Sequence, residues 1–191
     1  MKNYFLIMAL VCTAITFSQN SKFSVSIAYP MTMGENYFNR NDGVFDLGAQ
    51  YRFLDAKAVQ VGVSLNGSFF NYTFETDQTK TTEKTFVAQP RVFAELNIPA
   101  IKSFKPFVGI GYAFTSFKNE FDNGQNSIEE NTSASGLNLN MGISYHIFNG
   151  LFVQAQYDYI KAEREEGTVF NTEESFYQKI NLLKLGVGYR F

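Results

Sequence analysis

From residue 22 to the end of the chain, apolar and polar residues alternate with a period of two, and helical spacing is not convincing anywhere. In LKLGVGYRF, one face carries Leu183, Leu185, Val187, Tyr189 and Phe191, and the other carries Lys184, Gly186, Gly188 and Arg190. Eight segments of strand length share this alternation: 22–29, 44–53, 59–70, 86–98, 107–114, 137–147, 151–159 and 183–191. The pattern predicts eight β-strands, each with one apolar face.

The connections between these segments alternate in length. The long, polar connections are residues 31–43, 75–85, 115–136 and 160–180, and the short ones are 54–58, 99–106 and 148–150. Outer-membrane barrels combine tight periplasmic turns with long external loops in this way. We therefore predict an all-β protein, an eight-stranded antiparallel up-and-down transmembrane β-barrel with long surface loops.

Aromatic residues on the apolar faces are sorted by height. They form one belt at the short-turn end, Tyr51, Phe53, Tyr145, Tyr189 and Phe191, and one at the other end, Tyr29, Phe45, Phe86, Tyr112, Phe114, Tyr157 and Tyr159. Aliphatic residues such as Val61, Ile110 and Leu185 lie between the belts. A bilayer favours aliphatic side chains in its hydrocarbon interior and tyrosine at its headgroups. We expect the apolar faces to meet lipid and the polar, glycine-rich faces to line a narrow lumen.

The composition agrees with strands and excludes one class of partner. The chain has 191 residues, enough for a single domain, and 17% of them are aromatic, with 21 Phe, 11 Tyr and no Trp. That bias favours strands over helices. The net charge of −2 provides no basic field for nucleic acid, so we predict no nucleic-acid partner.

The first twenty residues, MKNYFLIMALVCTAITFSQN, read as an export signal. Lys2 precedes an apolar run (4–17) that is too short to span a bilayer as a helix, and small residues precede a break after Ser18. We predict a signal peptide at 1–18 and an outer-membrane barrel domain at 19–191. Cys12, the single cysteine, lies in the signal, so the mature chain is expected to have neither disulfides nor thiolate metal sites.

The chain resembles the small outer-membrane β-barrel domain family of Gram-negative bacteria, akin to the OmpA-type and OmpX-type barrels. The signal segment, KPFVGIGYAF (105–114) and the terminal LGVGYRF carry the resemblance across roughly residues 20–191. It implies a location in the Gram-negative outer membrane, with lipid and lipopolysaccharide as neighbours. It also implies that the barrel-assembly machinery reads Tyr189 and Phe191 as a C-terminal assembly signal. It says little about activity, because members of such families differ in function.

Charged residues on the inner faces are the closest approach to a site. Counted from the strand ends, Asp46, Arg91, Asp158 and Lys184 fall at mid-barrel height, and Arg52, Glu95 and Arg190 fall lower. Charges in so narrow a lumen need partners, so we predict a salt-bridged lumen network that fills the barrel. The alternative is a gate for protons or small ions.

Other chemistry has little basis in the residues. His146 is the single histidine, with Ser144 on the same face but no identifiable acid, and one histidine without cysteine offers no zinc site. We predict no catalytic residue, no metal and no cofactor.

Two features fit the barrel poorly. The first is Pro90, which predicts a bulge or a broken hydrogen-bonded pair on its strand. Five bulky apolar residues also fall on the inner face, namely Phe70, Val87, Phe93, Phe107 and Phe152.

Four functions remain open at this point. The favoured one is a non-enzymatic outer-membrane barrel with a filled polar lumen and long surface loops, for envelope structure or surface interaction with an unknown partner. The second is a porin-like, low-conductance pore for small solutes or ions. The third is a lipid-modifying barrel enzyme, and the fourth is a soluble lipid-binding barrel.

Overall fold

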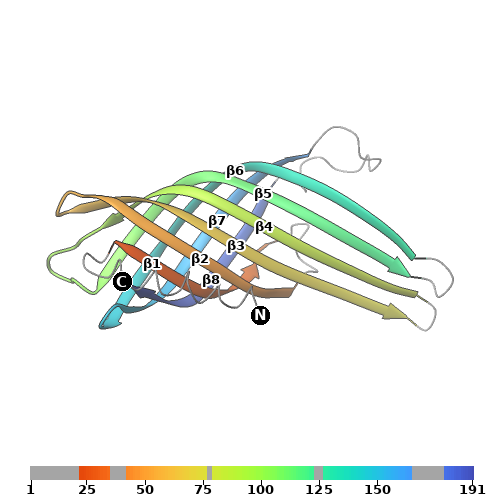
Figure 1. Cartoon of the computed structure of the whole chain (residues 1–191), viewed down its shortest axis with the longest axis horizontal. Helices are drawn as coiled ribbons and strands as arrows, with labels where there is room; N and C mark the ends of the chain where they lie inside the picture. The colour runs from red at the N-terminus through yellow and green to blue at the C-terminus, as the bar shows by residue number, and fades with distance from the viewer. Residues whose placement is uncertain (1–21, 35–41, 77–78, 123–126, 165–178) are drawn as a thin grey trace, which may run out of the picture.

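The computed structural model describes residues 22–34, 42–76, 79–122, 127–164 and 179–191. The described residues form eight β-strands in a closed barrel (Figure 1): β1 Phe23–Thr32, β2 Asp42–Asp55, β3 Val59–Thr76, β4 Thr79–Leu96, β5 Phe104–Asp122, β6 Ser127–Phe148, β7 Leu151–Arg164 and β8 Lys179–Arg190. Within this part of the chain, no helix is long and apolar enough to cross a membrane. The predicted signal peptide (1–18) lies outside the described residues.

Each strand pairs in antiparallel fashion with its sequence neighbours, and β1 and β8 close the barrel. Their ladder runs from Ser24 opposite Arg190 to Thr32 opposite Leu182. Beyond it, the Phe191 amide donates a 2.8 Å hydrogen bond to the Phe23 carbonyl. Closure leaves no unpaired strand edge in the wall, which is the condition for a sheet to span a bilayer. The predicted up-and-down barrel is confirmed.

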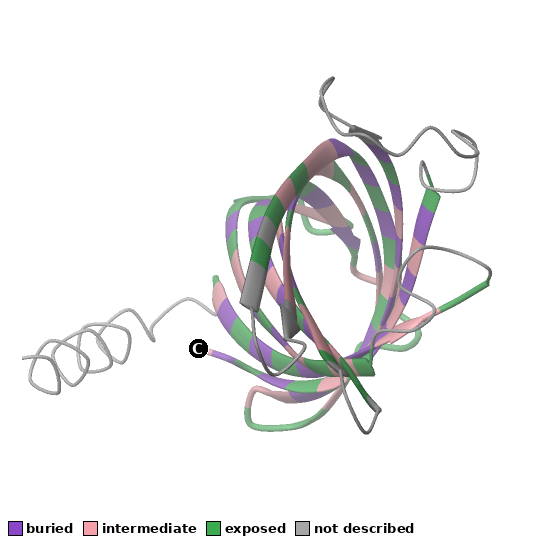
Figure 2. Ribbon diagram, turned by 90° about the vertical axis from the view of Figure 1, so that its right-hand side faces the viewer, coloured by how far each residue is buried: buried purple, intermediate pink, exposed green. Residues whose placement is uncertain are grey.

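The side-chain directions also follow the prediction. Ile110 and Leu185 are 55% and 49% exposed, whereas Asn140 and Gln156 are 6% and 1% exposed. Buried and exposed residues alternate along the strands (Figure 2). The apolar face therefore points outward and the polar face points into the barrel, the reverse of a soluble barrel.

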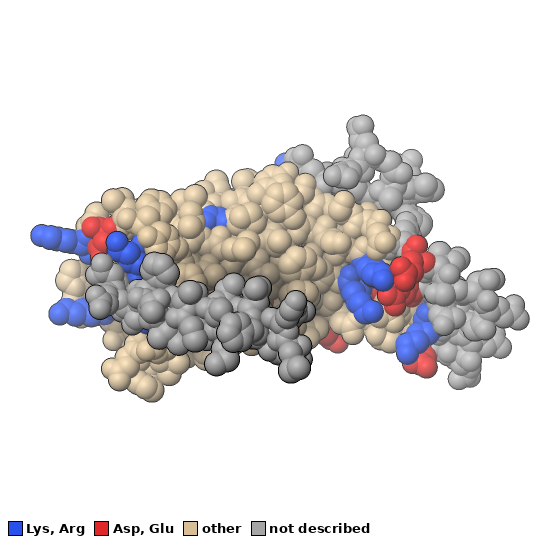
Figure 3. Space-filling model, viewed as in Figure 1, with Lys and Arg blue, Asp and Glu red and all other residues tan. Residues whose placement is uncertain are grey.

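The outer surface carries the predicted aromatic belts. At the upper end the rings of Phe45, Phe69 and Phe86 follow one another at centroid distances of 4.6 and 4.7 Å. At the short-turn end, the Tyr189 and Phe191 rings lie 5.0 Å apart. On the face drawn in Figure 3, charged residues gather at the two ends of the barrel, and the wall between them is almost uncharged. This layering matches the hydrocarbon band and headgroup zones of a bilayer.

The prediction of long loops was wrong for two of the four connections. Residues 75–85 and 115–136 lie mostly in strands, because β3 continues to Thr76, β4 already begins at Thr79, β5 continues to Asp122 and β6 begins at Ser127. β3 to β6 therefore project beyond the other strands (Figure 1). Backbone pairing does not require apolar side chains, and threonine and aromatic residues favour strands even where the flanking residues are charged. The centre of the predicted 160–180 loop lies outside the described residues.

The tight turns are where the sequence pattern predicts them. Asn149 and Gly150 have φ angles of 40° and 87°, which is the pattern of a two-residue type I′ hairpin turn between β6 and β7. Lys57, with a φ of 57°, occupies the turn between β2 and β3. Pro90 pairs with Leu65 of β3 but interrupts the ladder with β5, whose register is the same on both sides of the gap. The pair is thus broken on one side without a bulge.

Candidate functional site

The lumen is filled by layers of side chains, and β4 crosses all of them. Its successive inward residues, counted from the short-turn end, are Glu95, Phe93, Arg91, Gln89 and Val87. Glu95 belongs to a lower charge cluster and Phe93 to a phenylalanine layer. Arg91 and Gln89 belong to a mid-lumen network, and Val87 belongs to an upper apolar layer. All five side chains are at most 4% exposed.

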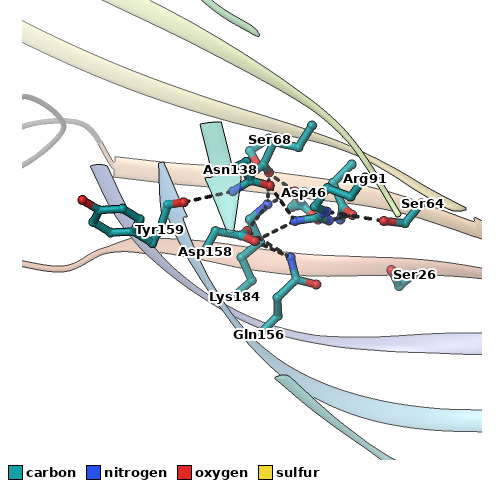
Figure 4. Close-up of polar contacts among 12 residues, drawn as sticks. Ser26, Asp46, Ser64, Ser68, Arg91, Asn138, Gln156, Asp158, Tyr159 and Lys184 are labelled. Carbon is teal, nitrogen blue, oxygen red and sulfur yellow. Dashed lines mark hydrogen bonds and ion pairs between the residues drawn. The ribbon is translucent and has the colours of Figure 1, made fainter. Parts of the chain in front are cut away.

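The mid-lumen network is centred on Lys184. Its ammonium group lies 2.8 Å from an Asp46 oxygen and 3.0 Å from an Asp158 oxygen, and it donates a 2.5 Å hydrogen bond to Gln89 Oε1. Lys184, Asp46 and Asp158 come from β8, β2 and β7 and are all 0% exposed. One cation thus joins carboxylates from two separate strands inside the barrel (Figure 4).

Arg91 is the second cation of the network. One terminal nitrogen of its guanidinium donates a 2.6 Å hydrogen bond to Asp158, and the other donates to Asn66 Oδ1. Its Nε lies 3.4 Å from the Ser64 hydroxyl. The guanidinium is planar and keeps its charge, so it can fix several partners at once. Arg91 therefore ties β4 to β3 and to β7 across the lumen.

Neutral groups complete the coordination of both carboxylates. Asp46 accepts 2.6 Å hydrogen bonds from the Asn66 amide and the Ser68 hydroxyl. Asp158 accepts 3.0 Å hydrogen bonds from the Gln156 amide at both oxygens. Two acids and two bases balance each other, which offsets the cost of burying four charges.

The lower charge cluster surrounds Glu95. Arg52 and Arg190 donate to its carboxylate at 2.8 Å and 2.7 Å, and the Lys105 ammonium lies 3.6 Å away. Arg52 also donates to Ser24 at 3.0 Å and stacks over the Phe93 ring at 5.4 Å. The cluster closes the lumen at the short-turn end with one carboxylate for three cations.

The phenylalanine layer separates the two charged groups. Phe93, Phe107 and Phe152 are 3%, 5% and 3% exposed. Each lies opposite a glycine of a neighbouring strand, namely Gly62, Gly142 and Gly188. A Cβ at Gly142 would lie 2.5 Å from the Phe107 ring, so the glycine leaves the space that the ring occupies. The register of the strands therefore places these three rings inside the lumen.

The upper apolar layer corrects the prediction of a polar lumen. Phe70, Val87, Ala113, Ile160, Ala162, Ile180 and Leu182 form a buried cluster above the network. Sequence reasoning missed its β7 and β8 members because the polar stretch at 160–180 predicts a loop. Extending the alternation of 151–159 forward would have indicated Ile160 and Ala162, and extending that of 183–191 backward would have indicated Leu182 and Ile180. The lumen therefore has an apolar layer above the mid-lumen network and the phenylalanine layer below it.

The seven predicted charged residues fall into two groups. Asp46, Arg91, Asp158 and Lys184 meet in the mid-lumen network, and Arg52, Glu95 and Arg190 meet below the phenylalanine layer. Sequence reasoning missed Lys105, which lies in a predicted turn, and the amides of Gln89, Asn66, Asn138 and Gln156, which add hydrogen bonds.

Ser144 and His146 have separate contacts in the structure. The Ser144 hydroxyl donates to the Lys105 carbonyl at 3.4 Å, and the His146 ring packs 5.4 Å from the Phe152 ring. Among the described residues, no three His, Cys, Asp or Glu side chains gather in a way that would hold a metal ion.

The comparisons with known proteins place the chain in a family. The family described as "Outer membrane protein beta-barrel domain" matches residues 5–191. The chain belongs to this family. It is a transmembrane barrel of the Gram-negative outer membrane. No curated protein sequence matches the chain significantly.

Solved structures of other outer-membrane proteins share the fold of this family member. Ail, the attachment invasion locus protein of Yersinia pestis, is 18% identical with a TM-score of 0.57, over 89% of this chain and 98% of Ail. The N-terminal barrel domain of Pseudomonas aeruginosa OprF is 15% identical with a TM-score of 0.53, over 90% and 98% of the chains. A major outer membrane protein of Thermus thermophilus is 14% identical with a TM-score of 0.59, over 89% and 99%.

Proposed function

We propose that the protein is a non-enzymatic outer-membrane barrel that strengthens the envelope and presents its outer strands at the cell surface. The observation that carries the proposal is the mid-lumen network, in which Lys184 bridges Asp46 and Asp158 with all three side chains fully buried. Moving any of these groups to admit a solute would leave a buried charge unpaired, which costs about 3–5 kcal/mol. A lumen filled in this way favours a structural role over transport.

The outer end supports a role at the surface. Strands of 18 to 22 residues, β3 to β6, are longer than the roughly 9–11 residues that a tilted strand needs to cross a bilayer. The excess raises a charged sheet above the membrane, with Lys118 3.1 Å from Glu120 and 3.3 Å from Glu129. Lipopolysaccharide is the neighbour we propose for the upper aromatic belt, and a protein or glycan partner would meet the projecting strands.

The competing function is a narrow pore, and it is favoured by the same charges, since acids and bases in one layer can exchange partners. Recording current across a planar bilayer that contains the purified protein separates the two. Our proposal predicts no unitary current steps at neutral pH. Reproducible steps that change in size when Lys184 is replaced would refute it and establish the pore.

A further inference from the structure

The short-turn end of the barrel contains a pocket of about 490 Å³. Its lining includes Lys105 and Arg190 of the lower charge cluster and Lys102 and Asn149 of the turns. Tight turns face the periplasm in outer-membrane barrels. The pocket therefore opens on the periplasmic side, below the filled lumen.

The charged side chains that line this pocket are all of one sign. Three cations line it, Lys102, Lys105 and Arg190, and no Asp or Glu side chain of the described residues does. The nearby carboxylate of Glu95 is already shared by Arg52, Arg190 and Lys105. One carboxylate cannot neutralise three cations, so the side chains leave an excess of positive charge at the mouth of the barrel, which the α-carboxylate of Phe191, another lining residue, reduces.

Polar atoms at the pocket also lack partners. Arg190 is 8% exposed and lines the pocket, and its Nε has no hydrogen-bond partner within the described part of the chain. The same holds for His146 Nε2, which belongs to another lining residue. Gln60, a third lining residue, donates its amide to the exposed Asp55 at 2.8 Å, and its Oε1 has no partner among the described residues. The ammonium groups of Lys102 and Lys105 and the guanidinium of Arg190 supply donors that suit a ligand with several acceptor oxygens.

We propose that the pocket binds a phosphoryl group, with Lys105, Lys102 and Arg190 supplying charge-assisted hydrogen bonds. Lysine binds phosphate as a point charge and arginine as a planar fork. Tyr189 and Phe191 also line the pocket and belong to the lower aromatic belt. The group therefore comes from the headgroup of an inner-leaflet phospholipid or from a soluble phosphate ester, and the binding chemistry is the same.

The test uses the full barrel in octyl glucoside micelles, which contain no phosphate. Inorganic phosphate is added at constant ionic strength, and backbone amide shifts are followed by two-dimensional NMR. We expect saturable shifts confined to the surroundings of Lys105, His146 and Gly150. The Lys105→Gln variant weakens binding about tenfold, the loss expected for one charge-assisted hydrogen bond.

Two further variants control for charge and folding. Lys57→Gln removes a cation of the same barrel end outside the pocket and leaves binding unchanged, whereas Lys102→Gln, at an exposed turn position, weakens it without disturbing the lumen. A heat-dependent gel shift verifies that each variant is folded. Shifts that rise linearly with phosphate, or that are equal in the Lys57 and Lys105 variants, would overturn the proposal.

A second arm identifies the source of the phosphoryl group. The titration is repeated in nanodiscs of phosphatidylglycerol. If a lipid headgroup fills the pocket, added phosphate causes no shifts in the nanodiscs but still causes them in the micelles. A soluble ligand gives the same saturable response in both, and either outcome supports the site.

Discussion

Replacing Lys184 with methionine tests whether the mid-lumen network stabilises the barrel. Methionine has a similar length and fits an apolar environment, so the variant removes the charge with little change in volume. It deletes the contacts of 2.8 Å to Asp46, 3.0 Å to Asp158 and 2.5 Å to Gln89. One guanidinium, that of Arg91, would then remain in the network, and it contacts Asp158 but not Asp46.

The size of the loss in unfolding free energy depends on the hydrogen-bond partners that each carboxylate retains in the variant. Asp158 keeps Arg91 at 2.6 Å, whereas Asp46 keeps only the neutral donors Asn66 and Ser68. Removing one partner of a buried ion pair costs about 3–5 kcal/mol. Because Asp46 retains two hydrogen bonds, we expect the lower value, about 3 kcal/mol. That lowers the folding equilibrium constant about a hundredfold.

The assay is equilibrium unfolding by urea in phospholipid vesicles. Folding is followed by circular dichroism and by the heat-dependent gel shift, since the chain has no tryptophan for fluorescence. The transition midpoint of Lys184→Met is expected to fall at an unchanged slope with urea concentration. A second change, Asp46→Asn, removes the orphaned charge and should restore part of the loss.

The matched control is Lys161→Met on β7, where the lysine is exposed. Surface changes of this kind leave the unfolding free energy within about 0.5 kcal/mol of the starting protein. If Lys184→Met were as mild as this control, the network would not be the stabilising element that we infer.

Three further predictions concern other layers of the barrel. Gly142→Val places a Cβ 2.5 Å from the Phe107 ring and 2.6 Å from the Ala155 carbonyl oxygen. The free energy of unfolding in urea should therefore fall by about 1–3 kcal/mol. An unchanged unfolding midpoint would contradict the packing. Glu95→Gln leaves Arg52, Arg190 and Lys105 without their shared carboxylate and should cost at least about 3 kcal/mol by the same measurement, while a neutral result would mean that water replaces the pairs. Phe191→Ala should lower the amount of assembled barrel in outer-membrane fractions, with Phe191→Tyr as the tolerated control; equal amounts for both variants would count against an assembly role.

Much of the barrel wall could be predicted because a strand with one face in lipid and one in the lumen alternates apolar and polar residues. Ile110 and Leu185 are exposed and Asn140 and Gln156 buried, as the alternation indicates. The strand ends could not be predicted in the same way. Above the membrane both faces of a strand meet water, so the alternation of apolar and polar residues fades although the backbone ladder continues. The polar stretches at 75–85 and 115–136 resemble loops for this reason.

The inner charges show a second limit of the sequence. The alternation of side chains along each strand places Asp46, Asp158 and Lys184 on the inner face. Their height in the barrel follows from counting residues from the strand ends. The stagger between strands decides which acid contacts which base. Lys184 and Asp46 are 138 residues apart, so no local sequence pattern indicates that they pair. The upper apolar layer was hidden because its β7 and β8 residues lie next to a polar stretch.

The most direct test of the account is the depth and accessibility of spin labels along the outer wall in phospholipid bilayers. Cysteine is introduced singly at Val108, Ile110 and Val187, which are 60%, 55% and 48% exposed, in a mature chain predicted to have no other cysteine. We predict high accessibility to oxygen and low accessibility to a water-soluble nickel chelate at all three positions. Labels there that meet the chelate as freely as a label at the exposed turn residue Lys57 would contradict the outward apolar face and the membrane assignment with it.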